Sequence, residues 1–305
     1  MILNRSVRQL NTKSKLIHLH QCRGASWKTM RSILTNDPLL STLYTKSTKE
    51  WAELLMLPSD KLDSFLRDLH SLNLQKLLDQ YDSNDIEILS FFDKDYPYLL
   101  KQIYDPPWIL YMKGNRGYLK DMNGIGVVGA RKPSISGLQA LKSLLPPLVQ
   151  AGYLIISGVA EGIDSAAHQL TLKEKGKTIG VLGGGHFHIY PKGNIPLAQE
   201  MMKNGLLISE TPPQRRAEPW MFPMRNRIIS GLSRGVLVVE ARQKSGTLIT
   251  AQCALEQGRE VFAVPGSPIH DLSTGTNRLI QEGAKLVLTA NDIIDELPML
   301  FTIDC

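Results

Sequence analysis

Between residues 124 and 266 the chain alternates short runs of aliphatic and β-branched residues with longer, more polar segments. The apolar runs cover residues 125–128, 153–156, 178–182, 206–208, 236–239 and 260–264. The segments between them are long enough for helices, and this alternation is typical of β-strand–helix–β-strand units. Strands in such units lie parallel and are covered by helices on both faces. The pattern therefore predicts an α/β domain with one parallel sheet.

The first 82 residues follow a different pattern, rich in Leu, Lys and Ser and poor in Gly. Apolar residues recur there at helical spacing, as at Leu62, Phe65, Leu69 and Leu72. We expect a small all-helical domain of the SAM or helix-hairpin type over residues 1–82. A linker over residues 83–120, with a strand-like patch at 86–92, should lead into the α/β domain at 121–305. The helical domain either packs as an appendage or contacts a partner or nucleic acid, and its sequence leaves both open.

Predicted helices in the α/β part have recognisable ends. Asp164 can cap a helix over residues 165–175, and Asn194 precedes a helix with a proline in its first turn. Thr247 leads into a helix over residues 248–257. The apolar pair at residues 228–229 should start another helix directly after an arginine-rich segment.

That arginine-rich segment, residues 222–227, is the strongest chemical signal in the chain. It places Arg225, Asn226 and Arg227 after Phe222 and a proline. The planar guanidinium group matches phosphate oxygens in pairs, and a helix start adds free N–H groups and partial positive charge. We call residues 222–227 the clamp segment and expect it to bind phosphate. Gly, Ser and basic residues also follow the predicted strands, at the edge of the sheet where ligands of such folds bind.

Composition permits an anionic partner without requiring one. The 305 residues include 35 Lys and Arg against 29 Asp and Glu, a net charge of +6. Three dispersed cysteines form neither a metal-binding spacing nor a disulfide framework, and no ligand set completes the pair His186 and His188. The start of the chain lacks an apolar signal-peptide region, and no run of about 18 apolar residues occurs. We therefore expect a cytoplasmic protein without membrane insertion and without a metal.

Glycine-rich motifs in the chain do not indicate a nucleotide cofactor. Gly124, Gly126 and Gly129 match the spacing of the dinucleotide motif, but they lie within a predicted strand instead of following one. The second strand ends in Ser157 and Gly158, where that motif requires an acidic ribose ligand. The three glycines at 183–185 lack the Gly-Lys-Ser/Thr of a P-loop. We expect no cofactor.

An ordered set of short motifs between residues 124 and 284 resembles the DNA-processing protein A family (DprA, also called Smf). The motifs are Gly129-Ala130-Arg131, Ser157-Gly158, Gly162-Ile163-Asp164 with His168, Tyr190-Pro191, Ser209-Glu210, Phe222-Pro223 with Arg225-Asn226-Arg227-Ile228-Ile229, Glu240 with Ser245-Gly246-Thr247-Leu248-Ile249-Thr250-Ala251, and Val264-Pro265-Gly266. The resemblance implies an extended Rossmann-like domain that binds single-stranded DNA. It also implies a homodimer that protects incoming DNA during natural transformation, in competent cells, and loads the RecA recombinase for DNA recombination. Apolar residues at 279–280 and 293–294 are candidates for a dimer face.

The chain departs from the family pattern in three places. Ala130 stands where Ser is common, and Glu161 where many members carry a basic residue. The chain ends at Cys305 without the winged-helix domain that some members append, so we expect little affinity for double strands beyond the electrostatic contribution.

The residue types give the expected contacts with a single strand. The basic candidates, which would neutralise phosphates and release counterions, are Arg131, Lys132, Lys192, Arg215, Arg216, Arg225, Arg227 and Lys244. The small residues that would let backbone N–H groups approach phosphates are Gly129, Ser134, Ser136, Ser157, Gly158, Ser245 and Gly246. Asn226 completes the clamp, and Phe222 with Trp220 can stack on unpaired bases.

Each of these candidates has a structural alternative. Arg225 and Arg227 can instead pair with Glu210 and Glu240, Trp220 can anchor a loop, and His168 is more typical of a packing residue than of a ligand. An enzyme is the main functional alternative, because residues 245–250 are similar to the Gly-Gly-x-Gly-Thr-x-x-Glu turn of nucleotide phosphoribohydrolases. Thr250 replaces the glutamate that such enzymes need. We therefore predict a non-catalytic protein, with a phosphoribohydrolase or a nucleotide-binding sensor as alternatives.

Overall fold

The structure, a computed structural model, describes residues 11–300 and divides into two compact units. The first unit comprises Met1–Phe91 with Pro107–Ile109, and the second comprises Phe92–Pro106 with Leu110–Cys305. The expected linker at 83–120 is thus divided between both units. Our expectations for the first few residues and for Cys305 lie outside the described residues.

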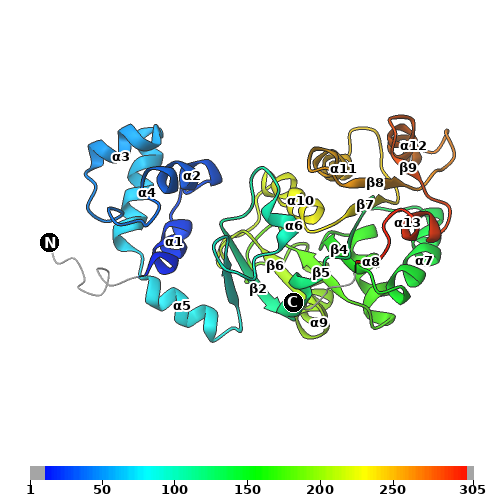
Figure 1. The fold of residues 1–305 in the computed structure, drawn as a ribbon, viewed down its shortest axis with the longest axis horizontal. Coiled ribbons are helices and arrows are strands. Elements are labelled where there is room, and N and C mark those ends of the chain that lie inside the picture. Colours follow the sequence, from blue (N-terminus) through cyan, green and yellow to red (C-terminus); the bar gives the residue numbers. More distant parts are fainter. Residues whose placement is uncertain (1–10, 301–305) are drawn as a thin grey trace. The chain divides into compact units, whose positions relative to one another are not determined.

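The first unit is helical from Thr12 to Asp82. It contains α1 (Thr12–Gln21), α2 (Trp27–Asn36), α3 (Thr48–Leu55), α4 (Ser59–Ser71) and α5 (Leu74–Asp82), followed by β1 (Glu87–Ser90) (Figure 1). Ser26 and Ser47 cap α2 and α3 by accepting first-turn N–H groups, as Ser and Thr side chains commonly do. Trp51 and Phe65 are fully buried and meet edge to face with their ring centroids 5.4 Å apart. These aromatic side chains give the unit a hydrophobic core of its own.

The second unit is built on a mixed, mostly parallel sheet. Its strands follow the order β2-β6-β5-β4-β3-β7-β8-β9. They are β2 (Ile109–Gly114), β3 (Gly124–Val128), β4 (Leu154–Gly158), β5 (Thr178–Val181), β6 (Leu206–Ser209), β7 (Gly235–Val238), β8 (Glu260–Ala263) and β9 (Lys285–Leu286). Strands β3 to β8 confirm the predicted parallel strands, whereas β2, which pairs antiparallel with β6, and β9 were not predicted.

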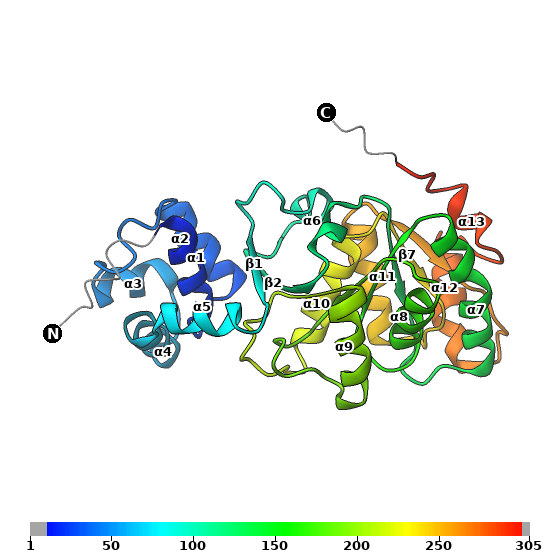
Figure 2. The same ribbon diagram turned by 90° about the horizontal axis from the view of Figure 1, so that it is seen from below.

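Helices cover both faces of this sheet. They are α6 (Tyr98–Lys101), α7 (Ile135–Gln150), α8 (Ile163–Lys173), α9 (Ile195–Asn204), α10 (Met221–Gly231), α11 (Gly246–Glu256), α12 (Thr274–Gln281) and α13 (Asn291–Ile294), with 3-10 turns η2 (Arg116–Lys120), η3 (Lys192–Asn194) and η4 (Asp271–Ser273). Helices α7, α8 and α9 lie side by side, and α10 packs against α11 (Figure 1, Figure 2). The predicted Rossmann-like arrangement is confirmed.

Alternate residues of β3 face different helices. Ile125 and Val127 belong to a hydrophobic core that includes Leu144 of α7. Gly126, between them, faces α10, where an added Cβ would lie 3.4 Å from Ile229 Cγ2. This alternation is the period-two pattern of a strand that is buried on both faces.

Three predicted helix starts are wrong. Helices α8 and α11 begin two residues earlier than predicted, and α10 begins seven residues earlier, which changes the site. Helix α8 begins at Ile163 after Gly162, so Asp164 lies in the first turn instead of capping it. Helix α11 begins at Gly246 and ends at Glu256. Helix α10 begins at Met221, so the whole clamp segment is helical. The predicted start of α9 after Asn194 is confirmed.

Two further expectations concern long apolar stretches. No helix within residues 11–300 is long and apolar enough to cross a membrane. In the two stretches nominated for a dimer face, Leu279 and Ile293 are buried within the second unit. One residue of each pair therefore contributes to the core instead of to an open surface.

Candidate functional site

The carboxyl ends of the central strands meet at one edge of the sheet, and a pocket of about 710 Å³ opens there. Chain connections lead from β3 to β4 on one side, whereas β7 pairs with β3 on the other. In open α/β sheets, ligands bind outside the strand ends at such a reversal of strand order. We call this cavity the main pocket. Most of the residues that line it follow β3 and β7 or lie in α8, α10 and α11.

Exposed basic side chains stand around the main pocket. Arg131 and Lys132, which follow β3, are exposed and line it. Arg242, which follows β7, also lines it, although we did not select it from the sequence. Its position just after a strand end is the same signal that identified Arg131. Arg242 lies 3.7 Å from Asp271, but both side chains are largely exposed, so this pair adds little stability and leaves the charge near the pocket.

Arg225 forms part of the floor of the main pocket. Its side chain is buried, and Nη1 donates a hydrogen bond to the carbonyl of Val181, while Nε donates to Asn226 Oδ1 at 3.1 Å. Gly158 leaves room for this guanidinium, because a Cβ at that position would overlap it. Burial lowers the pKa of Arg225 from its usual value, and the nearby Asp164 carboxylate opposes that shift. The charge therefore lies beneath the pocket and not at its rim.

Asp164 is an acidic residue whose charge acts on the buried Arg225 guanidinium. It lines the main pocket, and burial raises the pKa of its carboxyl to about 6, against the opposing effects of Arg225 and Arg131. At neutral pH the carboxylate partly offsets the positive charge of the pocket floor.

Arg227 does not contribute to the pocket, which corrects our expectation that it contacts phosphate. Its Nη2 donates to both carboxylate oxygens of Glu210 at 2.8 Å, and its Nε donates to Asp105 Oδ2 at 3.0 Å. The side chain is almost completely buried. Residues two apart on a helix point in different directions, so α10 turns Arg225 toward the pocket and Arg227 away from it. The ion-pair alternative with Glu210 is the one observed.

The small residues expected at phosphates lie in different surroundings. Ser157 is fully buried with its hydroxyl donated to Val127 O, and the buried Gly158 carbonyl accepts from His168 Nε2 at 2.8 Å. Both are therefore inside the protein, which corrects that expectation. Gly129, Ser245 and Gly246 line the main pocket. Ser245 precedes α11, and its buried Oγ has no hydrogen-bond partner within residues 11–300.

Protein groups accept some of the N–H groups at the start of α7. Ser134 caps this helix, its backbone N–H donates to Glu240 Oε2 at 2.9 Å, and its hydroxyl donates to Glu240 Oε1. Glu240 therefore pairs with Ser134, and no arginine within residues 11–300 forms an ion pair with it. Ser136 is exposed but does not line the main pocket.

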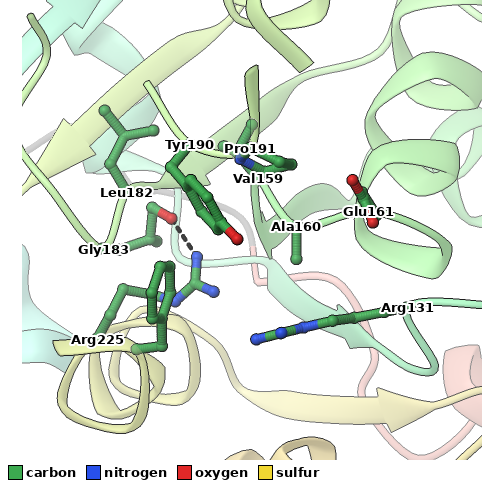
Figure 3. A pocket seen from close by; sticks show the side chains of 11 residues that line it. Arg131, Val159, Ala160, Glu161, Leu182, Gly183, Tyr190, Pro191 and Arg225 are labelled. Carbon is green, nitrogen blue, oxygen red and sulfur yellow. Dashed lines mark hydrogen bonds between the residues drawn. The ribbon is translucent and has the colours of Figure 1, made fainter. Parts of the chain in front are cut away.

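Aromatic side chains form one wall of a smaller cavity of about 40 Å³ that shares residues with the main pocket (Figure 3). The rings of Tyr190 and Phe222 lie 5.7 Å apart, and the Arg131 guanidinium stands 6.0 Å from the Phe222 ring centre. Figure 3 shows Arg131, Tyr190 and Arg225 directed toward the same space. The sequence analysis identified Tyr190 only as part of a motif and did not predict that it lies beside Phe222.

Most of the remaining candidates lie outside both cavities. Lys192, Arg215, Arg216 and Lys244 do not line either cavity, although Lys244 lies in the turn before α11. Trp220 is exposed, and its indole N–H donates to Glu218 Oε2 at 2.9 Å. Asn226, by contrast, lines the main pocket, and its Nδ2 donates to Gly246 O at 3.3 Å, which joins α10 to α11.

Two residues that bear on catalysis or metal binding, Thr250 and His168, are buried, although Thr250 also lines the main pocket. Thr250, at the position where phosphoribohydrolases carry glutamate, is buried in α11. His168 packs between Thr178 and the Gly158 carbonyl, and burial lowers its pKa to about 4. Among the described residues, no group of three His, Cys, Asp or Glu side chains is placed to hold a metal ion.

Comparisons with known proteins find similar sequences and similar folds. The family model of DNA recombination-mediator protein A matches residues 87–298. DNA processing protein DprA of Bacillus subtilis is 44% identical over 272 residues, covering 89% of this chain and 88% of its own length. DprA of Streptococcus pneumoniae is 45% identical over 207 residues, covering 68% and 73%.

Two solved structures resemble the fold. The crystal structure of DNA processing protein A from Streptococcus pneumoniae superposes with a TM-score of 0.81 at 34% identity, covering 95% of this chain and 100% of that one. The second is DNA processing protein A from Helicobacter pylori, whose structure is described as showing a single-stranded DNA binding mode. It superposes with a TM-score of 0.62 at 28% identity, covering 70% of this chain and 95% of that one.

Proposed function

Because this chain belongs to the DNA recombination-mediator protein A family, we propose that it binds single-stranded DNA at the main pocket and catalyses no reaction. The observation that carries the proposal is the position of Arg131 and Lys132. Both are exposed at the edge of a pocket whose floor holds a third positive charge, Arg225. The partner that such an arrangement suits is a flexible polyanion.

Phosphate groups have two kinds of donor in this pocket. Arg131 and Lys132 supply charged donors that release counterions from the strand. The first turn of α11 supplies backbone N–H groups, and the unpartnered Ser245 Oγ lies beside them. A helix start with free N–H groups favours an anion through both hydrogen bonds and partial charge.

Bases have an aromatic surface next to these donors. Phe222 and Tyr190 form the wall of the smaller cavity, and Arg131 lies over Phe222. Stacking of a base on an aromatic ring contributes about 1–3 kcal/mol and tolerates any base. Little sequence preference is expected.

The biological role that we propose for this binding rests on the family resemblance and not on the contacts. In this proposal the protein protects incoming strands during natural transformation, acts as a homodimer, and passes the strand to the RecA recombinase in the cytoplasm. Sedimentation at micromolar concentration tests the dimer, since the 305-residue chain has a mass of 34.0 kDa and a species of that mass alone would contradict it.

The proposal is tested by comparing two double variants of equal charge change. Arg131→Ala with Lys132→Ala removes the two rim cations, whereas Lys173→Ala with Lys203→Ala removes two exposed lysines of α8 and α9 that do not line the main pocket. Fluorescence anisotropy with a labelled oligo-dT strand should show an affinity loss of about tenfold or more for the first pair only. Equal affinities would contradict the proposal.

A parallel measurement separates binding from catalysis. Incubation with adenosine monophosphate should leave the nucleotide intact, because Thr250 cannot supply the acid or base that ribosyl-bond cleavage needs. Released adenine would favour the phosphoribohydrolase alternative.

A further inference from the structure

A separate pocket of about 350 Å³ opens at the edge of the sheet opposite the main pocket. Leu154, at the start of β4, and Ile179, near the start of β5, line it, as does Met122 just before β3. Parallel strands begin at one edge and end at the other, so this pocket and the main pocket lie at opposite edges. They share no lining residue. We call this cavity the basal pocket.

The floor of the basal pocket is aliphatic. Leu154, Ile156 and Ile179 come from the sheet, Leu232 follows the last turn of α10, and Leu119 lies in η2. All five side chains are buried. A planar nucleobase placed here would lose hydrogen bonds to water without gaining partners from these side chains. A large apolar side chain would lose none.

The rim of the basal pocket is aromatic on one side. Tyr98 and Tyr118 line it, and Tyr98 is 62% exposed. Tyrosine is enriched in protein–protein interfaces, where an apolar anchor enters a pocket and aromatic side chains surround it. The volume lies at the lower end of the usual range for ligand pockets, about 300–1,000 Å³. That size suits one anchoring side chain of a larger partner.

The charged rim residues leave a surplus of positive charge. Asp95 pairs with Arg116 at 3.0 Å, and Asp121 pairs with Lys177 at 2.7 Å. Lys94 and Lys120 also stand at the rim and are exposed, and neither forms an ion pair within residues 11–300. An acidic partner would therefore complement this rim, whereas a basic one would be repelled.

We propose that the basal pocket docks a peptide segment of a partner protein that presents one large apolar side chain flanked by acidic residues. The apolar side chain enters the aliphatic floor, and the acidic residues meet Lys94 and Lys120. This function is additional to strand binding, because the two pockets lie at opposite edges of the sheet. A bound strand and a docked partner can therefore occupy the protein together.

The test uses the full chain and a fluorescently labelled peptide with one central Phe between Asp and Glu residues. Anisotropy should report saturable binding, unchanged when the main pocket is filled with unlabelled oligo-dT. A matched peptide with Ser in place of Phe should bind at least about tenfold more weakly, since it loses the burial of an aromatic side chain.

Variants of the rim make the test specific. Lys94→Glu with Lys120→Glu should weaken peptide binding about tenfold or more, because two attractive charges become repulsive. Lys142→Glu with Lys173→Glu makes the same charge change on exposed lysines of α7 and α8 and should leave it unaltered. Tyr98→Ala, an exposed substitution that spares the charges, should also weaken it.

Three results would overturn the proposal. They are absence of saturable binding of the Phe peptide, equal affinity of wild type and the Lys94 and Lys120 double variant, and displacement of the peptide by oligo-dT. Oligo-dT affinity should be the same in wild type and in Tyr98→Ala, so failure here is distinguishable from failure of the strand-binding proposal.

Discussion

Replacing Arg227 by methionine separates a folding residue from a binding residue within the clamp segment. The substitution keeps an unbranched side chain in a buried position but removes the charge that neutralises Asp105 and Glu210. We expect Arg227→Met to lower the free energy of unfolding of the second unit strongly. We expect the affinity of the folded protein for single-stranded DNA to stay the same, because Arg227 does not line the main pocket.

The size of the loss in unfolding free energy follows from the three hydrogen bonds that Arg227 donates to Asp105 and Glu210 and from the burial of these groups. Breaking a buried ion pair by removing one partner commonly costs about 3–5 kcal/mol, because the remaining charge loses its compensation. The carboxylate side chains of Asp105 and Glu210 are 27% and 25% exposed, so water can partly hydrate them. We therefore expect the lower end, about 3 kcal/mol, which lowers the melting temperature of a unit of this size by about 6–12 °C.

Urea unfolding gives the free energy, and oligo-dT anisotropy below the transition gives the affinity. The double variant Arg227→Met with Glu210→Gln also removes the Glu210 charge that Arg227→Met leaves without its partner, and it should recover part of the lost stability. The single variant Glu210→Gln measures the effect of the second substitution alone. A variant as stable as wild type that has lost strand binding would refute the assignment of Arg227 to the structural network.

Salt, pH and backbone substitutions give three other expectations. Arg131→Ala should make the slope of log affinity against log salt less steep by about 0.7 for a single strand, with Lys203→Ala as control; identical slopes would contradict a phosphate contact. Burial lowers the pKa of His168 to about 4, so the stability gained by keeping it neutral is complete above about pH 6.5 and is lost as the pH falls toward 4, by at most about 3 kcal/mol. In urea titrations across this range, the free energy of unfolding should depend less on pH in His168→Gln than in wild type. An equal pH dependence in the two proteins would contradict this role of His168. Gly162→Ala should cost about 1–3 kcal/mol in thermal denaturation, because φ is +82° and a Cβ would overlap Ala130 O; an unchanged melting temperature would be the opposing result.

The sheet was predictable to the extent that its strands are apolar. Strands β3 to β8 are short aliphatic runs between helices, a pattern with few other interpretations. Strand β9 has only Lys285 and Leu286, both exposed, and so carries no hydrophobic signal. Strand β2 is an apolar run, but it pairs antiparallel at the end of the parallel series, and no local pattern specifies that partner.

The sequence identified several of the residues that line the main pocket, but not the directions in which their side chains point. The start of α10 carries no side-chain cap, and Pro223 lies in its first turn, where proline is tolerated. From the sequence we placed the start of this helix at residues 228–229, which put both arginines of the clamp segment just ahead of a helix start. Their separation onto different faces depends on where the helix begins. The sequence also could not show that Ser157 is buried, because a serine at the end of a strand can point either into the protein or toward solvent.

Arg225 places its charge underneath the main pocket, where protein atoms cover it. Mobile ions cannot approach a covered guanidinium as closely as they approach Arg131, so added salt weakens its field less. A strand held in this pocket should therefore resist elution by salt alone, with affinity levelling off at high ionic strength. Acidification below about pH 6 should raise that plateau, since protonation of Asp164 removes the negative charge that offsets Arg225.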